Sequence, residues 1–235
     1  MEDKKLGVLG GMGPAATSVF FEKVIENTEA AKDQDHIDMV ILNHATIPDR
    51  TEAILKQKGQ EFLKAIKKDF QVLEYAGVSN IAIPCNTSHF YIREMREMTE
   101  INIINMIEET VKFIRGKFGV GAKVGILATN GTIDSGIYQH GCEEYGLAPA
   151  IPAISQQQKV MRTIYDFKAD KQVNPGEVEA IIDRMVHEEG CSCVILGCTE
   201  LSCLDLNEEI AAYCVDAMQV LANQSIKLSG KKLKI

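Results

Sequence analysis

The sequence predicts an α/β protein with two similar lobes, each built on a mainly parallel sheet flanked by helices. Short apolar runs of strand length alternate with longer amphipathic segments along the whole chain. The first half opens on an apolar run at 6–9 and a Gly-rich loop, and the second half opens on a similar run at 123–127 and a polar turn. Each half later reaches a cysteine at the end of an apolar run, Cys85 in the first and Cys198 in the second.

The elements of the first half follow from these patterns in order. After the strand at 6–9, the loop Gly10-Gly-Met-Gly13 leads into a helix with Pro14 near its first position. A second strand at 37–42 ends at Asn43, and a helix at 61–75 stops before Gly77, as a C-terminal glycine favours. The pattern then predicts the strand before Cys85, a polar helix through residue 98, a strand at 101–104 and a helix at 106–117.

The second half repeats this plan in the same order. The run 123–127 corresponds to 6–9, the Cys198 strand corresponds to the Cys85 strand, and 212–216 with its helix at 217–228 corresponds to 101–105 and its helix. We interpret this as two lobes related by a pseudo-twofold axis, with the carboxyl ends of their strands at a shared cleft, where such sheets bind ligands. One continuous doubly wound sheet is the alternative. A helix from 174 to 189 and a solvated basic tail at 229–235 complete the prediction.

Composition limits the function classes. The chain has 235 residues, 46% hydrophobic and 25% charged, as in an ordinary globular protein. Its net charge of -8 argues against nucleic acid or an anionic membrane as partner. No apolar stretch reaches membrane-spanning length, and the N-terminal run is too short for a signal sequence. Seven cysteines without a signal peptide indicate reduced thiols and a cytoplasmic protein.

The Gly-rich loop fits the loose G-x-G-x-x-A form of a dinucleotide-binding loop after a strand. A dinucleotide site also needs an acidic residue at the end of the second strand, and this strand ends in Asn43 and His44. We therefore expect the loop to present backbone N–H groups to a small carboxylate at a helix N-terminus.

Cys85 and Cys198 are the candidate catalytic thiols. Hydrogen-bonding residues follow each of them (Asn86, Thr87 and Thr199) at a strand-to-helix turn, where the helix dipole lowers the pKa of a thiol. The other five cysteines are interpreted as core residues (Cys142, Cys191, Cys193, Cys203 and Cys214). A zinc site from Cys191, Cys193, Cys198 and Cys203 is a weaker alternative, because the spacing lacks a C-x2-C pair, and we expect no metal.

Three charged residues are further candidates, although most such side chains are surface charges. Arg50 follows Ile47-Pro-Asp, and a guanidinium suits bidentate contact with a carboxylate. Lys168 follows Ile164-Tyr-Asp-Phe. Glu200, beside Cys198, either orients a substrate ammonium or caps a helix. His89, in the helix after Cys85, is expected to be a positioning or core residue and not a base.

Taken together, these motifs resemble the aspartate/glutamate racemase family, in its aspartate racemase branch. The resemblance spans nearly the whole chain and rests on Leu9-Gly-Gly-Met-Gly-Pro14, Asp35-His36, Pro48-Asp-Arg-Thr51, Pro84-Cys-Asn-Thr-Ser-His89, Asn105-Met-Ile-Glu-Glu-Thr110, Leu127-Ala-Thr-Asn-Gly-Thr132 and Leu196-Gly-Cys-Thr-Glu-Leu201. It implies an isomerase that needs no pyridoxal or other cofactor and racemises aspartate, with glutamate as a further possible substrate.

The resemblance also implies the roles of individual residues. Cys85 and Cys198 are implied as opposed acid and base, with Cys198 acting on the L-enantiomer and Cys85 on the D-enantiomer. Arg50 and Lys168 are implied to hold the side-chain carboxylate. Because a thiolate is a modest base for a weakly acidic α-proton, prearranged donors must stabilise the transition state. The remaining expected substrate-binding residues are Met12, Asn43, Asn86, Thr87, Thr129, Thr199 and Glu200.

Two departures separate the chain from the glutamate racemases of wall synthesis. Those enzymes carry His where this chain has Glu200, and an Asp-Ser opening in place of Gly-Gly-Met-Gly. Ser88 replaces a more usual Ala. The family fold returns its C-terminal segment to the first lobe, so we expect one lobe at 1–100 plus 212–235 and the other at 101–211. The family also implies a homodimer.

Other functions remain open at this point. Another two-cysteine enzyme of the superfamily, such as a maleate isomerase or a hydantoin racemase, would keep both thiols, although Arg50 and Lys168 count against it. A non-enzymatic two-lobed amino-acid-binding module would have no need for paired thiols.

Overall fold

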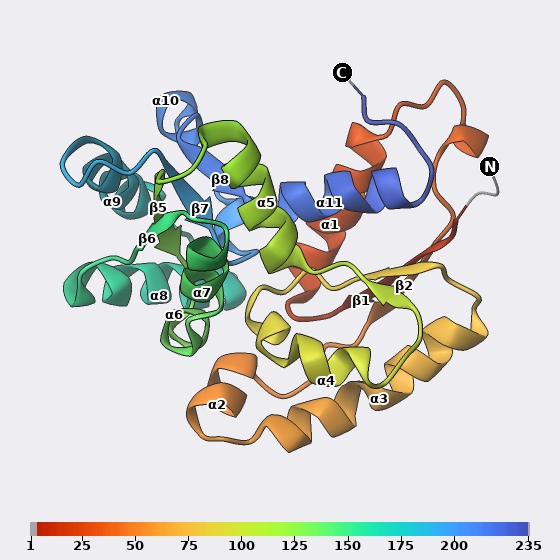
Figure 1. Cartoon of the computed structure of the whole chain (residues 1–235). Helices are drawn as coiled ribbons and strands as arrows, with labels where there is room; N and C mark the ends of the chain where they lie inside the picture. Colours follow the sequence, from red (N-terminus) through yellow and green to blue (C-terminus); the bar gives the residue numbers. More distant parts are fainter. Residues whose placement is uncertain (1–3, 235) are drawn as a thin grey trace. The chain divides into compact units, whose positions relative to one another are not determined.

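The computed structural model describes residues 4–234 and divides the chain into two compact units. Unit 1 comprises residues 1–109 and 218–235, and unit 2 comprises residues 110–217. Each unit contains one four-stranded parallel sheet flanked by helices (Figure 1). The predicted fold class of two similar α/β lobes is confirmed.

The sheet of unit 1 has the strand order β2-β1-β3-β4. Its strands are β1 (Leu6–Gly10), β2 (Met39–Asn43), β3 (Asn80–Ala82) and β4 (Asn102–Ile103). All three pairings are parallel, which requires a crossover connection between the strands. The central strand β1 is buried along its whole length, whereas the edge strand β2 is half-buried.

Helices cover both faces of this sheet. Figure 1 shows α1 and α11 on one face and α3 and α4 on the other. The helical elements of unit 1 are α1 (Pro14–Asn27), η1 (Asp33–Asp35), α2 (Arg50–Leu55), α3 (Gly59–Tyr75), η2 (Thr87–Tyr91), α4 (Ile92–Arg96) and the first turn of α5 (Met106–Phe118). In α3 the residues Phe62, Ile66, Phe70 and Leu73 are fully buried at helical spacing. They pack into one core with Ile81 of β3, so this helix holds the Cys85 strand in place.

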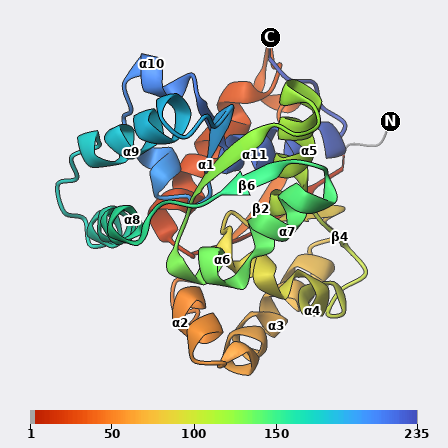
Figure 2. The ribbon, with the colours of Figure 1, turned by 60° about the vertical axis from the view of Figure 1, so that its left-hand side comes forward.

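Unit 2 has the strand order β6-β5-β7-β8, the same topology as unit 1. Its strands are β5 (Lys123–Leu127), β6 (Ala148–Ala150), β7 (Cys193–Leu196) and β8 (Cys214–Asp216). The helical elements are the rest of α5 from residue 110, α6 (Asn130–Ser135), α7 (Ile137–Glu144), α8 (Ile154–Lys168), α9 (Gly176–His187), η3 (Leu201–Cys203) and α10 (Glu208–Ala211). The last helix, α11 (Ala217–Leu228), begins at the unit boundary and belongs to unit 1 from residue 218. Helices α8 and α9 pack side by side (Figure 2).

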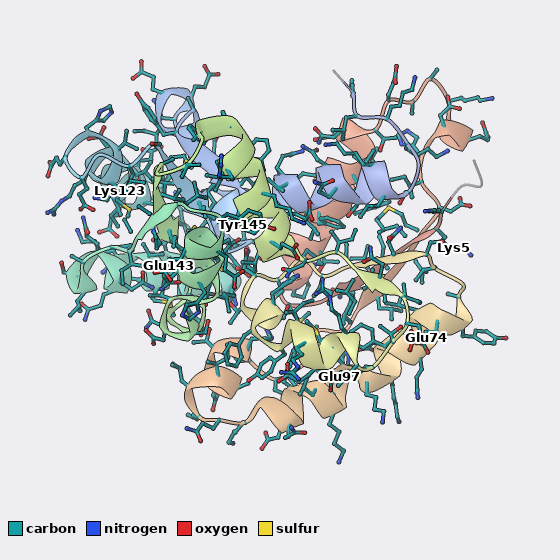
Figure 3. The ribbon with its side chains drawn as sticks, in the orientation of Figure 1. Lys5, Glu74, Glu97, Lys123, Glu143 and Tyr145 are labelled. Atoms are coloured by element: carbon teal, nitrogen blue, oxygen red, sulfur yellow. The ribbon has the colours of Figure 1, made fainter. Side chains whose placement is uncertain are left out.

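The repeat extends to individual side chains at the start of each sheet. Lys5 precedes β1 and Lys123 begins β5; both are labelled in Figure 3. The Lys5 ammonium donates to the carbonyl of Ala76, which ends α3, at 3.0 Å. The Lys123 ammonium donates to the carbonyl of Glu189, just past α9, at 2.6 Å. In both units a lysine therefore satisfies a carbonyl at or just past the end of the crossover helix.

The structure places both lobe boundaries later than predicted. The strand expected to open the second lobe is β4, which pairs with β3 in the first sheet. The strand at 212–216, expected in the first lobe, is β8 and pairs with β7 in the second sheet. The boundaries accordingly lie at 109/110 and 217/218, within α5 and beside the start of α11. Strand pairing decides the boundary, because each short strand completes the sheet of its own unit.

The C-terminal segment packs on unit 1. The α11 residue Gln219 accepts from Lys23 of α1, and the Leu228 carbonyl accepts from the Asn80 side chain. The tail was expected to be solvated. Lys232 and Lys234 are exposed, as expected, whereas the backbone of the tail is paired with the end of α1. Leu233 forms an antiparallel bridge with Thr28, and the Lys232 carbonyl accepts from the Glu29 N–H at 2.9 Å.

Within residues 4–234, no helix combines the length and the apolar character that a membrane span needs.

Candidate functional site

The two cysteines end equivalent strands at the place where parallel sheets bind ligands. In each unit the connections from the first and third strands leave in opposite directions, so the strand order reverses between them. Cys85 lies in the turn after β3 and Cys198 in the turn after β7. The loop 10–13 after β1 and Thr129 after β5 lie beside these turns at the same carboxyl edge of their sheets. The predicted motifs thus gather at one switch point in each unit.

The Gly-rich loop is folded against its own helix. Gly11 has a φ of +92°, and a Cβ there would lie 2.4 Å from the backbone of His44, so only glycine fits. The Gly11 N–H donates to the Thr17 hydroxyl at 2.9 Å, and this hydroxyl donates to the Gly13 carbonyl at 3.0 Å. The loop was expected to leave such N–H groups to a ligand. For Gly11 that expectation is wrong, because Thr17 reaches back one turn of α1.

Arg50 is a buried guanidinium on this edge of unit 1. It is 8% exposed and begins α2, which Asp49 caps by accepting from the Glu52 N–H. Its Nη2 donates to the Met12 carbonyl at 3.3 Å, and its Nη1 contacts the carbonyls of Ile47 and Pro48 at 3.4 and 3.1 Å. Its Nε is buried without a hydrogen-bond partner, and no carboxylate in residues 4–234 pairs with it. A buried cation held only by carbonyls is a fitting site for a carboxylate ligand.

The Cys85 turn is held from behind by two side chains. The Cys85 carbonyl accepts from the Ser88 hydroxyl at 2.7 Å and from His89 Nδ1 at 2.9 Å. His89 Nε2 accepts from the Met106 N–H at 3.2 Å, so the neutral Nδ1–H tautomer satisfies both contacts. Burial of His89 lowers its pKa. His89 therefore positions the turn, as predicted, and Asn86 and Thr87 are buried in the same turn.

Asn43 lies at the exposed carboxyl end of β2, paired in register with Gly10. The next residue, His44, is held through its Nδ1 by Asp69 of α3 at 2.7 Å.

In unit 2, Thr129 is the N-cap of α6. Its hydroxyl oxygen accepts from the Thr132 N–H at 3.2 Å and lies 3.1 Å from the Thr132 hydroxyl. The hydroxyl that the sequence assigned to the substrate thus also holds the helix that follows β5.

Cys198 contacts a buried carboxylate. Its Sγ donates to Glu200 Oε2 at 2.8 Å, and the Thr199 hydroxyl donates to the same oxygen at 3.4 Å. Lys168, the last residue of α8, lies 3.8 Å from Glu200 Oε1. Glu200 is 3% exposed and occupies the N-cap position of η3, but its side chain makes no capping hydrogen bond there. The structure brings Cys198, Glu200 and Lys168 together in one chain of contacts.

This environment raises the pKa of Cys198 well above its ordinary value. Burial is the largest cause, the Glu200 charge adds to it, and the Lys168 charge opposes it. The sequence argument expected a pKa lowered by a helix dipole. For Cys198 that expectation is wrong, because only the short η3 follows the turn and a carboxylate lies against the sulfur.

The remaining cysteines lie in or near the core of unit 2. Cys142, Cys191 and Cys193 are buried, whereas Cys203 and Cys214 are half-buried. Burial raises the pKa of Cys142, Cys193 and Cys214 to about 12 and also raises that of Cys191. Thiols with such pKa values are poor nucleophiles and bases near neutral pH.

Sequence reasoning missed Gln157 of α8. Its Nε2 donates to the Ala128 carbonyl and contacts Asn130 Oδ1, both at 2.9 Å, and its Oε1 is buried without a hydrogen-bond partner. The helical spacing of Gln157 and Lys168 could have indicated it, because this spacing places Gln157 on the same face of α8 as the candidate residue Lys168. The structure also shows that α2 and α8 are equivalent, since each follows the second strand of its unit and precedes the crossover helix.

Comparisons with known proteins agree with this arrangement. The family model for Asp/Glu/hydantoin racemases matches residues 9–225. The chain is 30% identical over 228 residues to the broad specificity amino-acid racemase RacX of Bacillus subtilis, covering 94% of this chain and 96% of the relative. Among solved structures, an aspartate racemase from Picrophilus torridus matches with a TM-score of 0.86 and 33% identity, covering 98% of this chain and 96% of that one. An aspartate racemase homologue from Pyrococcus horikoshii shares the fold, with a TM-score of 0.78, 23% identity and coverage of 97% and 99%.

Proposed function

Since this chain belongs to the Asp/Glu/hydantoin racemase family, we propose that it interconverts L- and D-aspartate without pyridoxal, with Cys85 and Cys198 as its acid and base. Two features support this mechanism. Both thiols end the third strand of their unit, and both lie at the switch point of a parallel sheet.

The chemistry requires two groups of matched character. One sulfur, as thiolate, takes the α-proton, and the other, as thiol, gives a proton to the opposite face of the α-carbon. The electron pair left on the α-carbon spreads into the substrate carboxylate, which donors of the protein must stabilise. Identical side chains suit a reaction whose substrate and product differ only in handedness, because each group serves as base in one direction and as acid in the other.

The observation that carries the choice of substrate is Arg50. Its guanidinium is buried, makes no ion pair with any described carboxylate, and lies at the same carboxyl edge of the unit 1 sheet as the Cys85 turn. A substrate with a side-chain carboxylate would supply the missing anion. This counts against a hydantoin, whose ring carries no carboxylate, and it favours an acidic amino acid if Arg50 holds the side-chain carboxylate, as the family resemblance implies.

A second candidate is a racemase of broader amino-acid range. RacX, the relative at 30% identity, is named for broad specificity. Lys168, the other expected carboxylate-binding residue, is paired with Glu200, so part of its charge is compensated within unit 2. In this reading Arg50 still favours an acidic side chain, and neutral side chains are accepted as well.

The test is exchange of the α-proton in deuterated water with both enantiomers of aspartate, glutamate and several neutral amino acids, after dialysis against chelator and without pyridoxal phosphate. We expect exchange and racemisation of aspartate, lost on Cys85→Ser or Cys198→Ser and retained in the matched control Cys203→Ser. Equal rates with neutral amino acids favour the broad-range candidate. Binding without exchange identifies an amino-acid-binding module, and turnover restored only by metal or pyridoxal phosphate contradicts the two-thiol mechanism.

A further inference from the structure

The two units differ in the sign of the charge buried beside the site residues. In unit 2 the buried charged residue at the Cys198 turn is Glu200, an anion in contact with the sulfur. In unit 1 the buried charged residue on the equivalent edge is Arg50, a cation. Equivalent sheet edges therefore carry buried charges of opposite sign, although the topology of the two sheets is the same.

The contact between Cys198 and Glu200 requires one proton between the two groups, and with Glu200 ionised that proton is on the sulfur. Cys198 Sγ donates to Glu200 Oε2 at 2.8 Å, and a thiolate at this position would place two anions side by side out of water. Like charges at such a distance strongly disfavour ionisation of the second group. The geometry thus stabilises the thiol form of Cys198.

The other titratable groups around Cys198 in unit 2 do not reverse this preference. Lys168 from α8 lies 3.8 Å from Glu200 Oε1 and is one-quarter exposed, so it compensates the carboxylate only in part. Tyr138 from α7 is fully buried, and burial raises its pKa, so its phenol is neutral. Asp216 from β8 accepts from the Ser202 hydroxyl at 2.6 Å and adds no positive charge. Glu200 is the group in direct contact with the sulfur.

Cys85 lacks such a partner. Its carbonyl is held by Ser88 and His89, and no carboxylate in the described part of the chain contacts its sulfur. His89 is neutral and faces the carbonyl. The thiol of unit 1 is therefore the one whose ionisation no neighbouring anion opposes.

We propose that Glu200 decides which thiol carries the proton in the free protein, keeping Cys198 as the proton donor and leaving Cys85 to act as the base. This inference rests on the proposed racemase function. It gives Glu200 and Lys168 a shared role, because the Lys168 charge partly offsets the effect of the Glu200 charge on the Cys198 pKa.

The protons balance through one turnover. The Cys85 thiolate takes the α-proton, so the C–H bond breaks, an S–H bond forms and the electron pair stays on the α-carbon. The Cys198 S–H bond then breaks, and its proton forms a new C–H bond on the opposite face. This leaves Cys85 as thiol and Cys198 as thiolate beside Glu200. The free protein returns to its first form when Cys85 releases a proton to water and Cys198 takes one from water.

The decisive experiment measures the pH dependence of Cys198 alkylation by iodoacetamide, with peptide mapping, and needs no turnover. Glu200→Gln removes the anion and keeps the shape, so we expect the pH midpoint of Cys198 to fall by about one unit, a tenfold rise in alkylation below the midpoint. Lys168→Met removes the opposing cation, so we expect the midpoint to rise. Glu209→Gln, an exposed acidic residue of α10, makes the same charge change and should move nothing.

An unchanged midpoint in Glu200→Gln, or a shift of the same sign in both variants, would overturn the proposal. If the buried Cys198 resists alkylation in every variant, the ultraviolet thiolate absorbance of a Cys85→Ser protein minus that of the matching Cys85→Ser/Cys198→Ser protein measures the same midpoint, because the subtraction removes the signal of the other five cysteines.

A second experiment tests which enantiomer the free protein deprotonates first, using protein in excess over α-deuterated D- or L-aspartate. The wild type should release deuterium first from the D-form, at least tenfold faster, and Glu200→Gln should reduce that ratio. Equal release from both forms contradicts the proposal, whereas absence of release from any amino acid contradicts the proposed function alone.

Discussion

Arg50 is a buried cation whose charge no described carboxylate compensates. Its guanidinium is held by the carbonyls of Met12, Ile47 and Pro48, none of which neutralises its charge. Burying an uncompensated cation is costly, so a carboxylate arriving from solvent gains an interaction that the free protein lacks.

Arg50→Lys should lower turnover of aspartate far more than turnover of any neutral amino acid that the protein accepts. Lysine keeps the charge but not the two parallel N–H donors, so a charge-assisted contact worth roughly 1.5–3 kcal/mol is weakened. The measurement is kcat/KM for aspartate and for a neutral substrate, with Arg93→Lys, an exposed residue of α4, as control. Equal losses for both substrates would show that Arg50 serves the fold.

His89 predicts a specific dependence of stability on pH. Burial lowers the pKa of His89 in the folded chain, whereas the unfolded chain keeps a value near 6.5. Below about pH 6.5 the unfolded chain therefore binds a proton that the folded chain does not, and stability falls as pH falls, by at most about 1.4 kcal/mol per pH unit.

Urea unfolding over a pH series measures this dependence. His89→Asn keeps a donor toward the Cys85 carbonyl and removes the titration, so its free energy of unfolding should depend less on pH in this range. His187→Asn, at an exposed site of α9, should leave the wild-type slope unchanged. If the free energy of unfolding of His89→Asn depends on pH as strongly as that of the wild type, groups other than His89 cause the acid sensitivity.

At the scale of elements, the duplication is visible in how each unit is assembled. Lys5 and Lys123 stand at the same place before equivalent strands and satisfy carbonyls at or just past the ends of α3 and α9. The helices α2 and α8 are likewise equivalent, and Arg50 opens the first while Lys168 closes the second. Each unit therefore carries its site cation on an extra helix placed before the crossover helix.

Lys5→Met and Lys123→Met should each lower the free energy of unfolding by about 0.3–1 kcal/mol. Each change removes a cation and a donor from the region where a helix ends, while methionine retains the apolar stem. Chemical denaturation of both variants measures the loss, with Lys64→Met on the outer face of α3 as control. A loss in one variant and none in the other would show that the two contacts are not energetically equivalent.

At the scale of the whole chain, the C-terminal segment packs against unit 1 and pairs with residues at the end of α1. The strand-like tail pairs with the end of α1, where the Lys232 carbonyl accepts from Glu29 and the Lys234 N–H donates to Asn27 at 2.8 Å. Unit 1 is thus formed from two separate stretches of the chain, with residues 110–217 of unit 2 inserted between them.

Truncation after Gly230 should loosen unit 1 locally and leave unit 2 unchanged. The truncation removes the acceptor of the Glu29 N–H, so hydrogen exchange at Glu29 should accelerate to the rate of an unprotected amide. Exchange in β5 and β7 should stay at the wild-type rate. Faster exchange across both sheets would instead show that the tail stabilises the whole chain.

Local pattern determined much of this protein, and distant contacts determined the rest. The sequence alone predicted the helix at 217–228, the helix ending before Gly77, the duplicated plan and the positions of Cys85 and Cys198, because each depends on periodicity or on neighbours along the chain. It missed β6, whose Ala-Pro-Ala sequence is tolerated only because it pairs at a sheet edge. The sequence could not show that the Gly11 N–H donates to the Thr17 hydroxyl or that Lys168 pairs with Glu200. Nor could it show that β4 belongs to the first sheet and β8 to the second, the reverse of what was expected. These contacts exist only after helices and strands pack, since packing brings together residues that no sequence spacing relates.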